Sequence, residues 1–117
     1  MDILVTNNPL VEVQLKSKFR VDFKDNDLIG ILAYVRDLVH KGHRLLTHPL
    51  AGSIKPNETL YKTVLITGTT DKVDTQSLII IEECIQAAQK FTPKHIPEKY
   101  LNDLQMVDLS LIRAAVQ

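Results

Sequence analysis

"ILVTNNPL", residues 3–10, passes from a short apolar run to polar, turn-forming residues. An apolar run that stops at Asn and Pro is typical of a buried strand that ends in a turn or at the start of a helix. Pro9 suits the first position of a helix, and Asn8 carries the kind of side chain that an N-cap needs. The stretch therefore predicts a strand over residues 3–6, followed by a helix that Asn8 caps.

Three further segments have strand character. Apolar and charged residues alternate over residues 19–23, which predicts a strand with one buried face. Residues 45–47 and 63–67 are short runs rich in apolar and β-branched side chains, and we expect a third and a fourth strand there. The direction of the fourth strand stays open. If it forms a hairpin with the third, Tyr61 and Lys62 approach the site and Thr67 lies at the far end.

The segment after Asp27 has a helical period instead. An apolar residue recurs every three or four positions as far as Val39, which predicts an amphipathic helix capped by Asp25 or Asn26. Gly42 is placed to adopt the left-handed conformation that commonly ends a helix.

Two more helical stripes follow. One begins after a cap at Asp74 or Thr75 and ends before Pro93, although residues 78–81 alone could also form a strand. The other carries Tyr100, Leu101, Leu104 and Val107 on one face, and Asp108 is interpreted as the cap of a final short turn.

The order of these elements predicts a single α/β domain over residues 1–117. Strands that alternate with helices favour a small three-layer sandwich around a mostly parallel four-stranded sheet. Right-handed crossovers would place the second strand beside the first and the third strand on the other side of the first.

Composition excludes several classes of protein. The 117 residues are 44% apolar and 24% charged, with 14 basic and 14 acidic side chains, so a nucleic acid has no overall electrostatic reason to bind. Cys84 is the only cysteine, which excludes an internal disulfide and the zinc sites built from several thiolates. No signal peptide or membrane span is predicted, and we expect a soluble cytoplasmic protein.

The predicted topology points to a ligand site. Ligands of open α/β sheets bind beyond the carboxyl ends of the strands where the strand order reverses, so loops 6–10 and 47–59 should meet there. The residues from His40 to Lys55 include six Lys, Arg or His but no Asp or Glu, which favours a small anion such as phosphate, acetyl phosphate or a carboxylate. The candidate ligand-binding residues are Thr6, Asn7, Asn8, His43, Arg44, Thr47, His48, Gly52, Ser53 and Lys55.

Each candidate also has a structural interpretation. His40 is interpreted as a cation at a helix C-terminus, and Cys84 as a small core residue. Strand alternation sends His43 and His48 to opposite faces unless the chain bends at Thr47, so a three-histidine zinc site is disfavoured. We expect no metal and no cofactor.

Two motifs together carry a family resemblance. "TNNPLV", residues 6–11, and "HKGHRLLTHPLAGSIKPNETLYK", residues 40–62, are similar to the GrdX family. This family comprises small proteins encoded alongside the glycine, sarcosine and betaine reductase systems of amino-acid-fermenting anaerobes. The resemblance implies an association with a reductase that converts glycine to acetyl phosphate, but it brings no catalytic residue.

Two functions are consistent with these observations. The preferred one is an accessory or ligand-sensing protein of a glycine reductase system, which binds a small anion or a component of that system. The alternative is a small enzyme that acts on a phosphorylated or carboxylated metabolite, with His43 or His48 as general acid or base. Whether the protein is an enzyme stays open.

Overall fold

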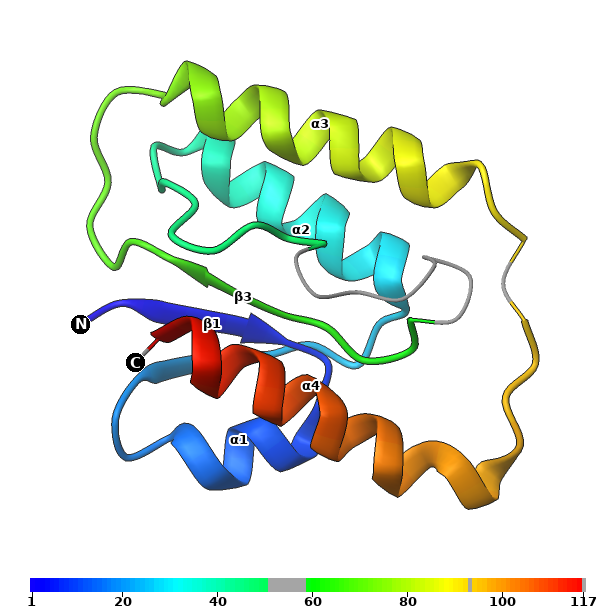
Figure 1. The fold of residues 1–117 in the computed structure, drawn as a ribbon. Helices are drawn as coiled ribbons and strands as arrows, with labels where there is room; N and C mark the ends of the chain where they lie inside the picture. Colours follow the sequence, from blue (N-terminus) through cyan, green and yellow to red (C-terminus); the bar gives the residue numbers. More distant parts are fainter. Residues whose placement is uncertain (51–58, 93, 117) are drawn as a thin grey trace.

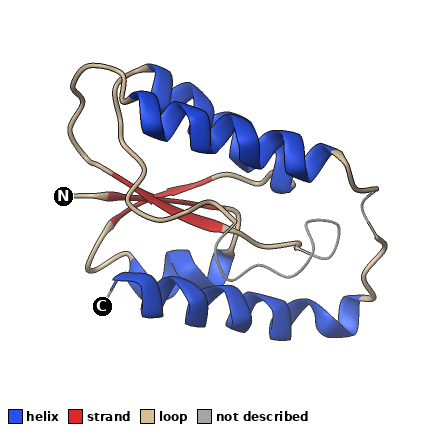
Figure 2. Ribbon diagram, turned by 45° about the horizontal axis from the view of Figure 1, so that its top comes forward, coloured by secondary structure: helices blue, strands red, loops and turns tan. Residues whose placement is uncertain are grey.

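The computed structural model describes residues 1–50, 59–92 and 94–116. Two helices cover each face of a central sheet, so the α/β class is confirmed (Figures 1 and 2). The elements in chain order are β1 (Ile3–Thr6), α1 (Pro9–Leu15), β2 (Arg20–Phe23), α2 (Leu28–His40), β3 (Thr63–Ile66), α3 (Thr75–Gln89), the 3-10 turn η2 (Glu98–Tyr100) and α4 (Leu101–Val116).

The sheet has three strands in the order β2-β1-β3. β1 and β2 run parallel, as the right-handed crossover through α1 predicts, with Ile3 opposite Arg20. β1 and β3 run antiparallel, with Thr6 opposite Thr63. The predicted four-stranded and mostly parallel sheet is therefore wrong, because the sheet is smaller and mixed.

The missing strand is the one expected at residues 45–47. Only Leu45 forms a bridge, which is antiparallel and joins it to Ile66. The Leu65 N–H donates to the side-chain Oγ1 of Thr47 at 2.9 Å, so a hydroxyl takes the place of a backbone carbonyl and the ladder stops there. β3 lies between β1 and this segment, so the expected direct contact of the first and third strands is also wrong. The antiparallel alternative for residues 63–67 is the one observed.

Alternation along β1 divides the core between the two faces of the sheet. Ile3 and Val5 pack in a cluster with buried residues of α2 and α3. Leu4 packs on the other side with Val11 of α1 and Ile112 of α4. Full burial of each such aliphatic side chain contributes about 1.5–3 kcal/mol, so these two clusters hold the layers together.

Local signals located the helix ends well. Asn8 caps α1 by accepting from the Leu10 N–H, and Asp74 caps α3, both as predicted. Gly42 has φ of 105°, which confirms the left-handed C-terminal turn of α2. The cap of α2 is Asp27, whose side chain accepts from the Gly30 N–H at 2.8 Å, so the expected caps Asp25 and Asn26 are wrong by one or two positions.

The last helix differs more from the prediction. α4 is a continuous helix, and its buried side chains are Asp108, Leu109 and Ile112. Tyr100 and Val107, expected on the inward stripe, are each 47% exposed. The helical period predicted for α4 was correct, but the buried face of the helix is displaced by about one residue from the predicted apolar stripe. None of the helices in the described ranges has the length and apolar character that a bilayer crossing requires.

Candidate functional site

A buried polar cluster lies where the end of β1 meets the start of β3. Its members are Thr6 and Asn8 at the end of β1, Thr63 at the start of β3, and Asp108 on α4, and each is at most 4% exposed. The antiparallel register of β1 and β3 places Thr6 directly opposite Thr63. The packing of α4 beneath the sheet then brings Asp108 to Asn8 and Thr63.

The hydrogen bonds of this cluster have a defined direction. The Asn8 N–H donates to Thr6 Oγ1 at 3.0 Å, and the hydroxyl oxygens of Thr6 and Thr63 lie 2.7 Å apart. Thr63 Oγ1 donates to Asp108 Oδ2 at 2.7 Å. Because a hydroxyl has a single proton, Thr6 must donate to Thr63, and the chain of donors ends on the Asp108 carboxylate.

Asp108 is therefore the terminal acceptor of the cluster, and its prediction as a helix cap is wrong. Its Oδ2 also accepts from Asn8 Nδ2 at 3.0 Å, and the backbone N–H of Thr63 donates to the same carboxyl group. Burial raises the pKa of Asp108 above its ordinary value, against the opposing effects of the Asn8 and Thr63 bonds and of the positive charge on Lys62.

Asn7 connects two neighbouring loops rather than facing a ligand space. Its Nδ2 donates to the backbone oxygens of Asn26 at 2.8 Å and Leu60 at 3.0 Å. Its Oδ1 accepts from the backbone N–H of Lys62 at 2.8 Å. We expected asparagines here to bond backbone groups, and Asn7 does so with all of its side-chain polar atoms.

A cavity of about 280 Å³ opens beside this cluster, between α4, the start of β3 and residues 47–48. Its polar lining comes from residues 47–48, from the start of β3 and from Asp108, whereas the rest of α4 contributes apolar side chains. The lining residues are Thr47, His48, Lys62, Thr63, Asp108, Leu111, Ile112, Ala114 and Ala115. Such a space suits a small ligand held by a few polar groups.

Lys62 is the basic residue of β3 and its flanks that lines this cavity, although it is only 4% exposed. Burial lowers its pKa, while the negative charge of Asp108 acts in the opposite direction. Lys62 follows the alternation of Val64 and Ile66, both in the cluster with α2 and α3. Cys84 of that cluster is a core residue, as predicted, and burial raises its thiol pKa to about 11.

His48 lies at the rim of the cavity and is exposed. The backbone N–H of Leu50 donates to its Nδ1 at 3.1 Å. In the neutral imidazole, the proton is therefore on Nε2, which makes that atom a hydrogen-bond donor. The chain does bend at Leu46 and Thr47, the condition on which a shared face for His43 and His48 depended.

The other predicted basic residues lie elsewhere. His43 Nδ1 donates to the Thr67 carbonyl oxygen at 2.7 Å, and the Arg44 N–H donates to Thr67 Oγ1 at 2.9 Å. Thr67 and Thr63 are four strand positions apart, roughly 13 Å, so His43 and Arg44 lie at the opposite end of β3 from His48. Gly52, Ser53 and Lys55 fall outside the described residues.

The structure thus brings together part of the predicted set. Thr47 and His48 line the cavity, and Thr6 and Asn8 are linked to it through Thr63 and Asp108. The important additions are Lys62, considered at the sequence level only for a hairpin, and Asp108. Asp108 could have been recognised in the sequence, because it lies four residues after Leu104 and so falls on the apolar stripe of the predicted helix.

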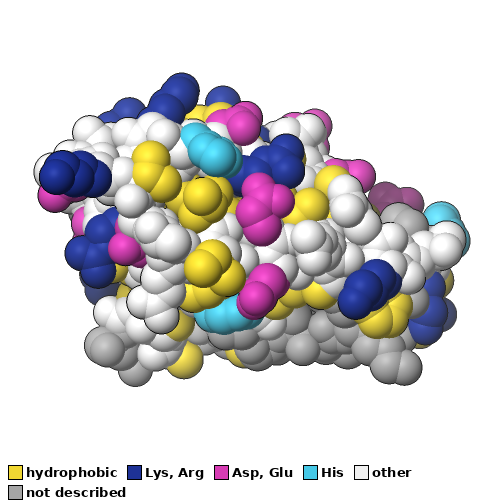
Figure 3. All heavy atoms as spheres, turned by 90° about the horizontal axis from the view of Figure 1, so that it is seen from above, with side chains coloured by type: hydrophobic (Ala, Val, Ile, Leu, Met, Phe, Trp, Pro, Cys, Tyr) yellow, Lys and Arg dark blue, Asp and Glu magenta, His cyan; other side chains and the backbone are white. Residues whose placement is uncertain are grey.

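The chemistry available here is hydrogen bonding, charge and proton transfer. Over the described ranges, no three His, Cys, Asp or Glu side chains converge as a metal site would require. The opposite face, formed by α2 and α3, carries interspersed acidic, basic and apolar side chains (Figure 3). One ion pair there joins Arg36 and Glu82 at 3.7 Å.

Comparisons with known proteins agree with the motif resemblance. A family model described as GrdX-like protein matches residues 3–117. No curated protein and no solved structure gives a significant match to the chain.

Proposed function

The chain belongs to the GrdX-like protein family, and from this membership and the cavity geometry we propose that it binds a small anion beside the start of β3. The ligand classes are phosphate, acetyl phosphate and short carboxylates. In this proposal the protein is an accessory or ligand-sensing component of a glycine reductase type of amino-acid fermentation.

The observation that carries the proposal is a buried lysine on the cavity wall. Lys62 is 4% exposed and lines the cavity together with His48, whose Nε2 carries a proton in the neutral ring. An anion at this wall would add a charge partner to Lys62, on which the Asp108 carboxylate already acts. The Thr47 hydroxyl accepts from the Leu65 N–H and keeps its own proton to donate at the same wall, whereas the Thr63 proton is already directed to Asp108.

Asp108 limits which anion fits. Its carboxylate lines the same cavity, so a fully ionised ligand would be repelled by it. Monohydrogen phosphate can present an oxygen to Lys62 and its own hydroxyl to Asp108, which avoids this repulsion. Because burial raises the Asp108 pKa, acidification neutralises this residue early, and anion affinity should increase as the pH falls.

The test is a thermal-shift titration at fixed ionic strength with phosphate, acetyl phosphate and acetate. At ten times the dissociation constant, a ligand stabilises the fold by about 1.4 kcal/mol, which raises Tm by several degrees in a domain of this size. Lys62→Met and His48→Ala should reduce the shift, while Arg44→Ala, at the other end of β3, serves as the matched control.

Two outcomes contradict the proposal. The first is no shift in the parent protein at millimolar ligand. The second is an equal shift in the parent, Lys62→Met and His48→Ala, because the ligand would then bind elsewhere.

The enzyme alternative is favoured by one observation, the fixed tautomer of His48 at the cavity rim. A histidine held by a backbone N–H through Nδ1 can exchange a proton with a ligand through Nε2. Measuring phosphate release during incubation with acetyl phosphate distinguishes an enzyme from a binding protein. Turnover by the parent that His48→Gln abolishes would support an enzyme, and binding without turnover would support the accessory role.

A further inference from the structure

β2 is the outer strand of the sheet on the side away from β3, and half of its backbone groups point outward. The Arg20 N–H donates to the Asp2 oxygen at 3.2 Å, and the Lys24 N–H donates to the Thr6 oxygen at 2.9 Å. Successive residues of a strand direct these groups to opposite sides, so Val21 and Phe23 present N–H and C=O groups to the open edge. Such an edge is a template for another strand.

We propose that β2 pairs with β2 of a second copy of this chain, antiparallel about a twofold axis at Val21, so that two three-stranded sheets become one continuous sheet. The partner is a second copy because the charges along β2 are self-complementary. A C2 interface uses the same patch on both subunits, which requires this property.

The charges select one register. With the axis at Val21, Arg20 faces Asp22 of the partner, twice by symmetry, at a non-hydrogen-bonded pair where side chains are closest. The alternative axis at Asp22 would place Asp22 against its own copy and Arg20 against Lys24 of the partner. Like charges directly opposite each other are unfavourable, which disfavours the axis at Asp22. An axis at Phe23 would set Asp22 opposite Lys24 of the partner, but Lys24 lies beyond the end of β2, so the Val21 register is the one that keeps both members of the charge pair within the strand.

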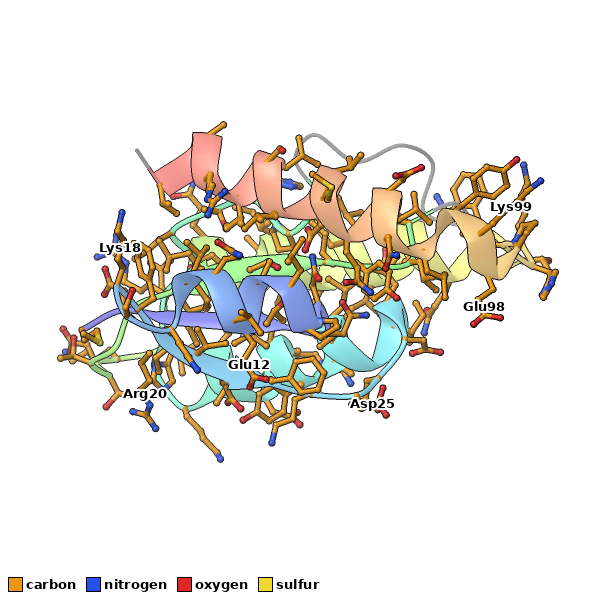
Figure 4. All side chains as sticks on the ribbon, turned by 90° about the horizontal axis from the view of Figure 1, so that it is seen from below. Glu12, Lys18, Arg20, Asp25, Glu98 and Lys99 are labelled. Atoms are coloured by element: carbon orange, nitrogen blue, oxygen red, sulfur yellow. The ribbon has the colours of Figure 1, made fainter. Side chains whose placement is uncertain are left out.

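The flanks of β2 agree with this register. Figure 4 shows Glu12 on the side of α1 that faces β2, with Arg20 at the sheet edge. Lys16 lies four residues after Glu12 and shares that side of the helix. The twofold axis brings this side of α1 toward its copy, where an acidic and a basic residue can pair. Lys18 precedes the strand and points away from Arg20, so it is not part of the ladder (Figure 4).

Asp22 can accept the additional contact. Its Oδ2 accepts from the Tyr34 hydroxyl at 2.5 Å, and its Oδ1 lies 3.7 Å from Lys24 Nζ. A carboxylate has about four acceptor positions, so these two partners leave capacity for an Arg20 guanidinium. The Tyr34 bond also fixes the orientation of the carboxylate, which lowers the entropy lost on pairing.

Sedimentation velocity across a concentration series tests the proposal. The parent should sediment as a dimer with twice the 13.2 kDa mass of the chain. Arg20→Glu or Asp22→Lys alone should weaken the dimer by roughly tenfold or more, and the double variant should restore it, because the pair is reversed but still complementary. Arg36→Glu, next to Glu82 on the helical face, is the matched control and should remain dimeric.

Disulfide cross-linking tests the register without charge changes. Val21→Cys lies on the proposed axis, where a hydrogen-bonded pair has Cα atoms about 5.5 Å apart, within the range of a disulfide. Mild oxidation should cross-link Val21→Cys and not Asp22→Cys, while Cys84 is 3% exposed and stays reduced. A monomeric parent, a dimer insensitive to both single charge reversals, or cross-linking of Asp22→Cys alone would each overturn the proposal.

Discussion

The two ends of β3 carry similar polar side chains in different surroundings. At the start of the strand, Lys62 and Thr63 are each 4% exposed and line the cavity beside α4. At the other end, Thr67 bonds the half-buried His43 and the exposed Arg44, and its bond with the Arg44 N–H is exposed to solvent.

The difference shows that covering by α4, rather than the density of basic residues, defines the candidate site. A hydrogen bond or charge removed from water has a larger effect than the same group in water, where solvent replaces lost partners and screens charge. Equal substitutions at the two ends of β3 should therefore have unequal consequences.

The largest effect is expected for Asp108→Ala. This change leaves the donors of Asn8 Nδ2, Thr63 Oγ1 and the Thr63 N–H buried without their acceptor, and we expect a loss of roughly 3 kcal/mol in the free energy of unfolding. Urea denaturation measures this loss. Asp74→Ala, which removes the half-buried N-cap of α3, should be less damaging, and an equal loss in both variants would contradict the comparison.

Matched hydroxyl deletions sharpen the comparison. Thr63→Val removes the bonds to Thr6 and Asp108, and we expect about 2 kcal/mol of destabilisation. Thr67→Val removes the bonds of its hydroxyl with the Arg44 N–H and the Thr69 oxygen at the exposed end, and about 0.5 kcal/mol is expected. Thermal or urea unfolding of both variants, at equal m-values, tests whether burial produces this difference.

The pH dependence of stability should also differ in sign between two aspartates. Burial raises the pKa of Asp108, so the unfolded chain loses this proton first and stability falls as the pH rises from the ordinary Asp value of 3.8 through the folded pKa. Bonds from the Ser77 side chain and N–H lower the pKa of Asp74, so its contribution is present above 3.8 and is lost as the pH falls.

Urea unfolding of the parent, Asp108→Asn and Asp74→Asn over acidic to neutral pH separates the two effects. The stability of Asp108→Asn relative to the parent should increase as the pH rises above 3.8, because the parent loses stability there. The stability of Asp74→Asn relative to the parent should decrease as the pH rises toward 3.8, because the parent gains stability over that range. Parallel curves for all three proteins would mean that neither carboxyl titrates differently on folding.

Much of the fold followed from local sequence signals. The Asn8 cap with Pro9, the left-handed Gly42 and the apolar period of α2 each depend on residues close together in the chain. Local signals could not order the strands, because residues 45–47 and 63–66 are similarly apolar. The arrangement depends on Thr47, whose hydroxyl ends the ladder after one bridge, and on the full burial of β3 next to β1.

The candidate site was predicted only in part for a related reason. Thr47 and His48 line the cavity, at a loop that leaves the sheet near the end of β1. Asp108 meets Asn8 across a separation of 100 residues, which no local pattern reveals. His43 and Arg44 were grouped with His48 because they are close in sequence, but an extended segment carries neighbours apart at about 3.3 Å per residue.

The most direct test is a phosphate titration followed by amide chemical shifts in the 15N-labelled protein at fixed ionic strength. We predict saturable shifts at Thr47, His48, Lys62, Thr63 and Asp108, with His43, Arg44 and Thr67 unchanged. Loss of these shifts in Lys62→Met, with the dispersion of the spectrum retained, would assign them to the cavity. Shifts centred on Arg44 and Thr67, or no saturable shift at millimolar phosphate, would contradict the claim that the α4-covered end of β3 binds the anion.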